Sequence, residues 1–227
     1  MQPTDPRWPK VLSLSVHEFR TPVTVVAGYI RMLLTDRAGA LNDQQRRLLQ
    51  EAEKSCGRLS ALLVEVSELS NLEAGTSPFN KSTVDLHTAL RDAVEKLPPL
   101  PERYVPVHLE LADEPATIDA DPARLVQALG SIIAGLRREV VDEEGLTIRE
   151  RRAGGAHEIL MGDGAMLAML ENEAGPPSAM FDEWRGGCGL SLAIARRILN
   201  AHDVTIYGPP LPLEKQKSGA RIVLRSA

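Results

Sequence analysis

Apolar positions recur with the spacing of amphipathic helices through the first third of the chain. Over residues 9–34 they form one broad stripe, which predicts a helix with a single packed side: Val11, Leu14, Val25, Ile30 and Leu33. Residues 35–40 then read as a loop. A second helix is expected to begin at Asn42 or Asp43, because either side chain can accept the free N–H groups of a first turn. Gly75 supplies the expected end of that helix.

The second helix carries apolar residues three, four or seven positions apart, at Leu48, Ala52, Leu59, Leu62, Val66 and Leu69. This spacing is typical of the seam of a helical bundle, although it would also suit the plain core of a hairpin. Two helices bury little apolar surface by themselves. We therefore predict a homodimer, in which two hairpins form a four-helix bundle.

Beyond a linker at residues 76–78, the pattern changes to short mixed elements. Helices are expected at residues 86–96, from Asp121-Pro122 onward, and at 190–201. Strands are expected at residues 105–111, 146–151, 158–161, 165–171, 204–207 and 220–224. This order predicts an α+β fold, a sandwich with helices on one face of a sheet. The expected domains are residues 1–76 and residues 77–227.

Composition narrows the possible functions of the 227 residues. A formal net charge of −5 argues against binding to nucleic acid, which requires a basic surface. Cys56 and Cys188 are too few to indicate a disulfide framework or a zinc site, and no metal site is predicted from them. No apolar run approaches the ~20 residues of a membrane span, and the first ten residues lack a signal-peptide core. A cytoplasmic protein is expected, which receives its input from elsewhere or is part of a longer chain.

The most informative chemistry lies in residues 17–22, His-Glu-Phe-Arg-Thr-Pro. On a helix, Glu18 can hold one ring N–H of His17 and so leave the other nitrogen as a nucleophile. Thr21 lies one turn further on the same face, where its hydroxyl can position a water molecule. Pro22 leaves the carbonyl of Glu18 without its helical donor. The alternative is that His17 is an ordinary exposed helix histidine.

Residues 15–23 resemble the phospho-acceptor box of two-component histidine kinases. Residues 69–75 are similar to the end of the second helix of their dimerisation and phosphotransfer domain. Residues 121–129 resemble the start of the helix with the asparagine box, and residues 187–194 resemble the second glycine box, which closes over nucleotide phosphates. The resemblance implies a bundle domain followed by an ATP-binding domain of the GHKL (Bergerat) type, with ATP and Mg²⁺ as cofactors.

The resemblance fails at the nucleotide site. Ser131 and Gly135 stand where the asparagine box supplies carboxamides, and Arg138 stands where lysine is usual. The first glycine box is matched only by residues 173–177, Glu-Ala-Gly-Pro-Pro. Glutamate is one methylene longer than the aspartate that normally reads adenine.

The resemblance implies that five residues of this chain remain as nucleotide contacts: Arg138, Glu173, Gly175, Gly187 and Gly189. ATP and Mg²⁺ binding is therefore predicted to be weak or lost, since each missing charge-assisted hydrogen bond costs ~1.5–3 kcal/mol. The alternative is a divergent working site that uses other ligands, such as Asp163 or Glu143.

The leading hypothesis is a phosphotransferase-like signalling protein with His17, Glu18 and Thr21 as its reactive residues. His17 would exchange a phosphoryl group with the aspartate of a response-regulator receiver domain, and Thr21 would orient water to dephosphorylate that aspartate. An upstream kinase or sensor is a further expected partner. Two alternatives stay open: an active ATP-dependent autokinase with an unusual site, and a non-enzymatic dimeric scaffold for a receiver or a kinase.

Overall fold

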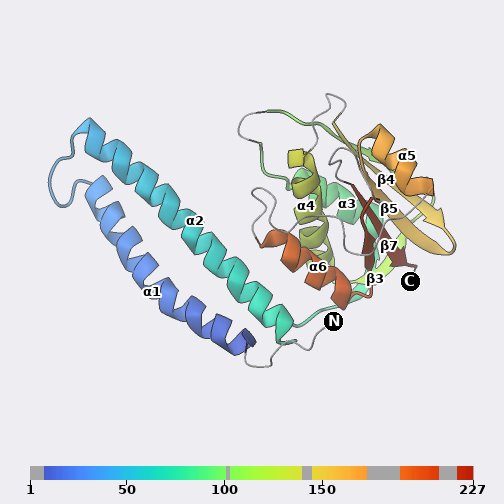
Figure 1. Cartoon of the computed structure of the whole chain (residues 1–227), viewed down its shortest axis with the longest axis horizontal. Helices are drawn as coiled ribbons and strands as arrows, with labels where there is room; N and C mark the ends of the chain where they lie inside the picture. Colours follow the sequence, from blue (N-terminus) through green and yellow to red (C-terminus); the bar gives the residue numbers. More distant parts are fainter. Residues whose placement is uncertain (1–7, 101–102, 140–144, 173–189, 210–218, 227) are drawn as a thin grey trace. The chain divides into compact units, whose positions relative to one another are not determined.

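The computed structural model describes residues 8–100, 103–139, 145–172, 190–209 and 219–226. Contacts between Cα atoms divide the chain into two compact units, residues 1–77 and residues 78–227. The first is a helical hairpin and the second is a mixed α/β unit (Figure 1). The fold is therefore α+β, as the sequence predicts.

The hairpin consists of α1 (Trp8–Leu34) and α2 (Asp43–Glu73). Asn42 and Gln45 form a capping box at the start of α2, in which each side chain accepts the backbone N–H of the other residue. At the opposite end, the Ser70 hydroxyl donates to the carbonyl of Pro9 over 2.7 Å. At the loop end, Arg46 of α2 donates to the carbonyl of Leu34 over 3.0 Å, so both ends of the helix pair are joined by hydrogen bonds.

The described residues of the second unit form two sheets. β1 (Ser82–Asp85) and β3 (Thr117–Ala120) form an antiparallel pair. The larger sheet has the strand order β2-β4-β5-β7-β6, and only its β2–β4 pair is parallel. Its strands are β2 (Val107–Glu110), β4 (Leu146–Ala153), β5 (Ala156–Gly162), β6 (Thr205–Tyr207) and β7 (Ala220–Arg225). The predictions omitted β1 and β3, each of which has only four residues.

Three helices cover one face of the larger sheet: α3 (Leu86–Glu95), α4 (Pro122–Glu139) and α6 (Ser191–Ala201) (Figure 1). Their apolar sides form the main core. Its largest fully buried side chains include Leu90, Leu129, Ile132, Ile133 and Leu136. Asp85 begins α3 by accepting the backbone N–H of His87, which is the capping that a carboxylate provides at a helix start.

The strand predicted at residues 165–171 is wrong, because α5 (Gly164–Asn172) occupies this segment. Its Ala-Met-Leu run is rich in strong helix formers, and the Asp163 carboxylate accepts the backbone N–H of Met166 over 2.7 Å to begin the helix. The placement of all helices on one face is also wrong. Met166, Leu167 and Leu170 pack on Leu160 of β5, which points to the opposite face from its neighbour Ile159.

Arginines from two strands hold the end of α5 on that second face. Arg149 of β4 pairs with the Glu171 carboxylate over 2.6 Å and also with Glu110 of β2. Arg221 of β7 donates to the carbonyl of Leu170 over 3.3 Å. These arginines offset the partial negative charge at the C-terminal end of α5. The helix is therefore attached to the sheet by polar contacts as well as by its apolar side chains.

Candidate functional site

His17 lies on the exposed side of α1, with 77% of its side chain accessible to solvent. Its Nδ1 lies 3.2 Å from a carboxylate oxygen of Glu18, which is itself 70% exposed. With the proton of the neutral ring on Nδ1 and donated to Glu18, Nε2 carries the lone pair. The helix therefore presents one unobstructed ring nitrogen to solvent, which is the geometry that a nucleophilic histidine requires.

Thr21 is also exposed and lies one helical turn after His17. The hydroxyls of Ser15 and Thr24 each donate to the carbonyl four residues earlier, over 2.9 and 2.8 Å. Among the described residues, the Thr21 hydroxyl has no such partner. Pro22 lies inside the helix next to it, without a backbone N–H of its own. The Thr21 hydroxyl is thus available to hydrogen-bond with water next to His17.

Apolar side chains remain exposed along both helices of the hairpin. Only Val16, Ile30, Cys56 and Ser70 are buried there. The exposed apolar side chains on α1 and α2 are Trp8, Val11, Leu14, Phe19, Val25, Val26, Tyr29, Met32, Leu48, Leu59, Leu62 and Val64. Many exposed apolar side chains on one helix pair are typical of a protein–protein contact.

The predicted nucleotide contacts are only partly within the described residues. On α4, Ser131 is half-buried, Gly135 is buried without a side chain, and Arg138 is exposed. Glu173, Gly175, Gly187 and Gly189 lie outside the described residues, as does Glu143. No group of three metal-ligating His, Cys, Asp or Glu side chains gathers within the described ranges. The described part of α4 therefore offers the Ser131 hydroxyl, the Arg138 guanidinium and the carboxamide of Gln127, but no carboxamide at the two asparagine-box positions.

The alternative ligand Asp163 is already engaged. One of its carboxylate oxygens accepts the backbone N–H of Met166 at the start of α5. The sheet lies between α5 and the helix α4, which carries Ser131 and Arg138 (Figure 1). The described structure therefore does not bring Asp163 together with the residues of the asparagine-box helix.

A buried charged cluster, which the sequence analysis missed, lies beneath α3. The Glu150 side chain is 1% exposed and accepts from His87 Nε2 over 3.0 Å and from His157 Nδ1 over 2.9 Å. Burial alone would raise the pKa of Glu150, but the hydrogen bonds from His157, His87 and the Ala112 N–H hold that pKa below its ordinary value. The one sequence signal that could have revealed this cluster is a glutamate inside a predicted strand, at Glu150.

Asp121 links three segments of the second unit. Its backbone N–H donates to His202 Nε2 over 2.9 Å, and its carboxylate accepts the N–H groups of Asn80 and Arg124 over 2.9 and 3.1 Å. Burial raises the pKa of Asp121, but the N–H groups of Arg124, Asn80 and Ala123 outweigh burial and leave the pKa lowered. The segment that follows the hairpin is thereby tied to the start of α4 and the end of α6.

The first unit matches a known family model. Residues 10–75 match the model of the His Kinase A (phospho-acceptor) domain. The circadian input-output histidine kinase CikA of Synechococcus elongatus is 26% identical over 210 residues, which are 84% of this chain and 26% of CikA. The chain thus spans about a quarter of the length of this relative.

Two solved histidine kinase structures share the fold. Full-length ShkA in complex with AMPPNP gives a TM-score of 0.69 at 23% identity, and covers 96% of this chain and 46% of ShkA. The kinase ThkA in complex with the response regulator TrrA gives a TM-score of 0.58 at 16% identity, and covers 96% of this chain and 61% of that one. At these identities the likeness concerns the fold of the hairpin and of the α/β unit.

Proposed function

Because this chain belongs to the histidine kinase family of two-component signalling, we propose that His17 accepts a phosphoryl group and exchanges it with the aspartate of a receiver domain. The observation that supports this most directly is the exposed His17 ring with Glu18 on its Nδ1. In the transfer, Nε2 attacks the phosphorus of the phosphoaspartate, the new N–P bond forms, and the P–O bond to the aspartate breaks. Glu18 stabilises the positive charge that the ring gains.

We further propose that Thr21 orients the water that hydrolyses the receiver phosphoaspartate. Its exposed hydroxyl lies one turn from His17 and has no hydrogen-bond partner among the described residues. A hydroxyl that donates to its own helix backbone, as Thr24 does, would be less available to a water molecule. The reaction needs no ATP. A receiver domain is the proposed partner, in keeping with the response regulator that ThkA holds in its complex.

The exposed apolar side chains of α1 and α2 support a homodimer. Packing against a second hairpin would remove these large apolar side chains from water, and burial of a fully exposed side chain of this size stabilises by ~1.5–3 kcal/mol. A dimeric four-helix bundle is the arrangement that covers such a seam. Among the described helices, none is long and apolar enough to cross a membrane.

ATP binding is proposed to be weak or absent. Gly135 cannot supply an oxygen ligand, and Ser131 is shorter than the carboxamide that the family places there. Mg²⁺ needs well-placed oxygen ligands beside the substrate phosphates. The described residues therefore fit ATP with Mg²⁺ poorly, and no step of the proposed transfer runs through them.

The proposed function is tested by phosphotransfer from a ³²P-labelled receiver domain. The full chain should gain acid-labile label, and His17→Gln should gain none. His108→Gln is the matched control, because His108 is also exposed but lies on β2 of the second unit. Label that persists in His17→Gln would refute the assignment. An unlabelled wild-type chain that still binds the receiver would instead favour the scaffold alternative.

A titration with ATP and Mg²⁺ separates the proposal from the autokinase alternative. We expect no saturable binding below millimolar ATP, and no labelling of His17 from γ-³²P-ATP. Labelling of His17 by ATP alone, absent in His17→Gln, would show that the chain is an active kinase with other nucleotide ligands.

A further inference from the structure

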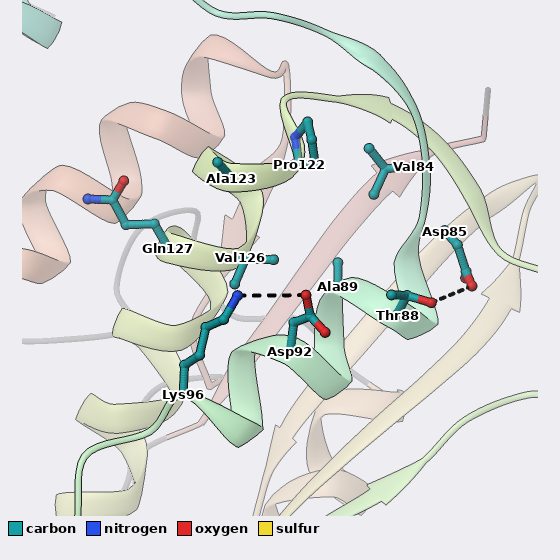
Figure 2. Close-up of a pocket in the computed structure, with 10 residues that line it drawn as sticks. All are labelled: Val84, Asp85, Thr88, Ala89, Asp92, Lys96, Pro122, Ala123, Val126 and Gln127. Atoms are coloured by element: carbon teal, nitrogen blue, oxygen red, sulfur yellow. Dashed lines mark hydrogen bonds and ion pairs between the residues drawn. The ribbon is translucent and has the colours of Figure 1, made fainter.

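A groove runs between α3 and α4 on the side of these helices that faces away from the sheet. Its first part is a hollow of 580 Å³ between the whole of α3 and the first turns of α4 (Figure 2). Its floor is apolar and consists of Val84, Ala89, Pro122, Ala123 and Val126. The hollow is thus a concave and mostly apolar site between two helices, which is a common setting for a bound ligand or partner.

The groove continues along α4 beyond Glu95, where α3 ends. A second hollow of 320 Å³ shares Lys96, Val126 and Gln127 with the first and extends along α4 to Ser131 and Arg138, the described residues of the predicted nucleotide face. From Pro122 to Arg138 the helix advances by ~24 Å, at 1.5 Å per residue. Gly130 lies at the floor, where an added Cβ would lie 3.7 Å from the carbonyl of Ala93. The groove is therefore elongated, and near Gly130 the backbone of α3 lies close to that of α4.

The rim of the groove changes charge along its length. Asp85 and Asp92 of the α3 side flank the first part, whereas Arg138 lies at the far end and Lys96 between them. Lys96 lies 3.7 Å from Asp92, and both side chains are largely solvated, so this pair is weak and easily exchanged for another partner. The hydrogen bond from the Thr88 hydroxyl lowers the pKa of Asp85 and keeps it charged at neutral pH.

We propose that this groove binds an amphipathic α-helix of a partner protein, with its apolar side chains on the floor, basic side chains at Asp85 and Asp92, and an acidic side chain near Lys96 and Arg138. The length of the groove along α4 matches a helix of about four turns. The two carboxylates at the first part repel phosphate, so a nucleotide, nucleic acid or anionic lipid fits this end poorly. The proposal does not depend on phosphorylation of His17.

The test uses the full chain and a labelled synthetic peptide of about 16 residues built from Leu, Ala, Lys and Glu. Its leucines form one helical stripe, with two lysines beside the stripe at one end and two glutamates at the other. We expect micromolar binding by fluorescence anisotropy. A peptide with lysine and glutamate exchanged should bind at least about tenfold more weakly.

Two tryptophan variants test the location. Ala123→Trp fills the floor at an exposed position of α4, whereas Ala168→Trp places the same side chain on exposed α5, beyond the sheet. We expect peptide binding to be at least about tenfold weaker in Ala123→Trp and unchanged in Ala168→Trp. The circular dichroism spectra of both variants should equal that of the wild type, which shows that both are folded.

Several outcomes would overturn the proposal. These are absence of binding up to millimolar peptide, equal binding to both peptides, and equal binding to both tryptophan variants. Displacement of the peptide by ATP with Mg²⁺ would also overturn it, because the groove would then belong to the nucleotide site.

Discussion

The buried carboxylate of Glu150 accepts hydrogen bonds from two histidines and one backbone N–H. The substitution Glu150→Gln therefore tests how much this carboxylate contributes to the free energy of unfolding. The variant keeps the shape of the side chain but replaces one acceptor oxygen by an NH₂ group. That group would face the ring N–H of His87 or His157, which lie 3.0 and 2.9 Å from the present oxygens. One charge-assisted hydrogen bond is lost, at ~1.5–3 kcal/mol, and a donor is left facing a donor. We expect Glu150→Gln to lower the free energy of unfolding by about 2–4 kcal/mol.

Hydrogen exchange of the β4 and β5 amides, read by mass spectrometry near neutral pH, measures this free energy in the second unit itself. The matched control is Glu114→Gln, which removes a carboxylate from a solvent-exposed 3.7 Å pair with Arg152. That pair should contribute less than about 1 kcal/mol. An effect of Glu150→Gln no larger than that of Glu114→Gln would refute the reasoning.

The same cluster predicts a pH dependence. The pKa of Glu150 is lower in the folded state than in the unfolded chain, so its stabilisation is fully present above the ordinary glutamate pKa of about 4.3. The stabilisation is lost as pH falls through the lower pKa of the folded state. The gap between wild type and Glu150→Gln in urea unfolding should therefore narrow below about pH 4. A constant gap over this range would mean that the carboxylate charge is not what the variant removes.

Three further changes test the hairpin. Thr21→Ala should slow receiver dephosphorylation by roughly 10²-fold and leave phosphotransfer with His17 nearly unchanged; equal loss of both would assign Thr21 a role in holding the helix near Pro22. Asn42→Ala removes the cap of α2 and should cost about 1 kcal/mol, seen as a lower melting temperature by circular dichroism, and an unchanged melting temperature would argue against the capping box. Leu62→Glu places a charge in the exposed apolar surface and should convert a dimer into a monomer in light scattering, whereas a wild-type monomer would contradict the proposed bundle.

The sequence predicted most elements of the second unit but failed at residues 165–171. The segment is a short continuous run of apolar residues, and such a run is compatible with a buried strand as well as with a buried helix. The deciding signals were Asp163, which caps the first turn of α5, and the high helix propensity of Ala, Met and Leu. The four-residue strands β1 and β3 were missed, because each is stabilised by pairing with the other across about 35 residues of chain.

By itself, the sequence determined the two long helices, the capped start of α2 and the order of His17, Glu18 and Thr21 on one helix. These features follow from side chains that lie within one turn of each other, where spacing alone fixes the geometry. Only the tertiary structure decided which sheet face α5 covers, that Glu150 lies between His87 and His157, and that α3 and α4 leave a groove between them. Each of these joins segments far apart in the chain, and their meeting depends on strand pairing and helix packing that no local pattern encodes.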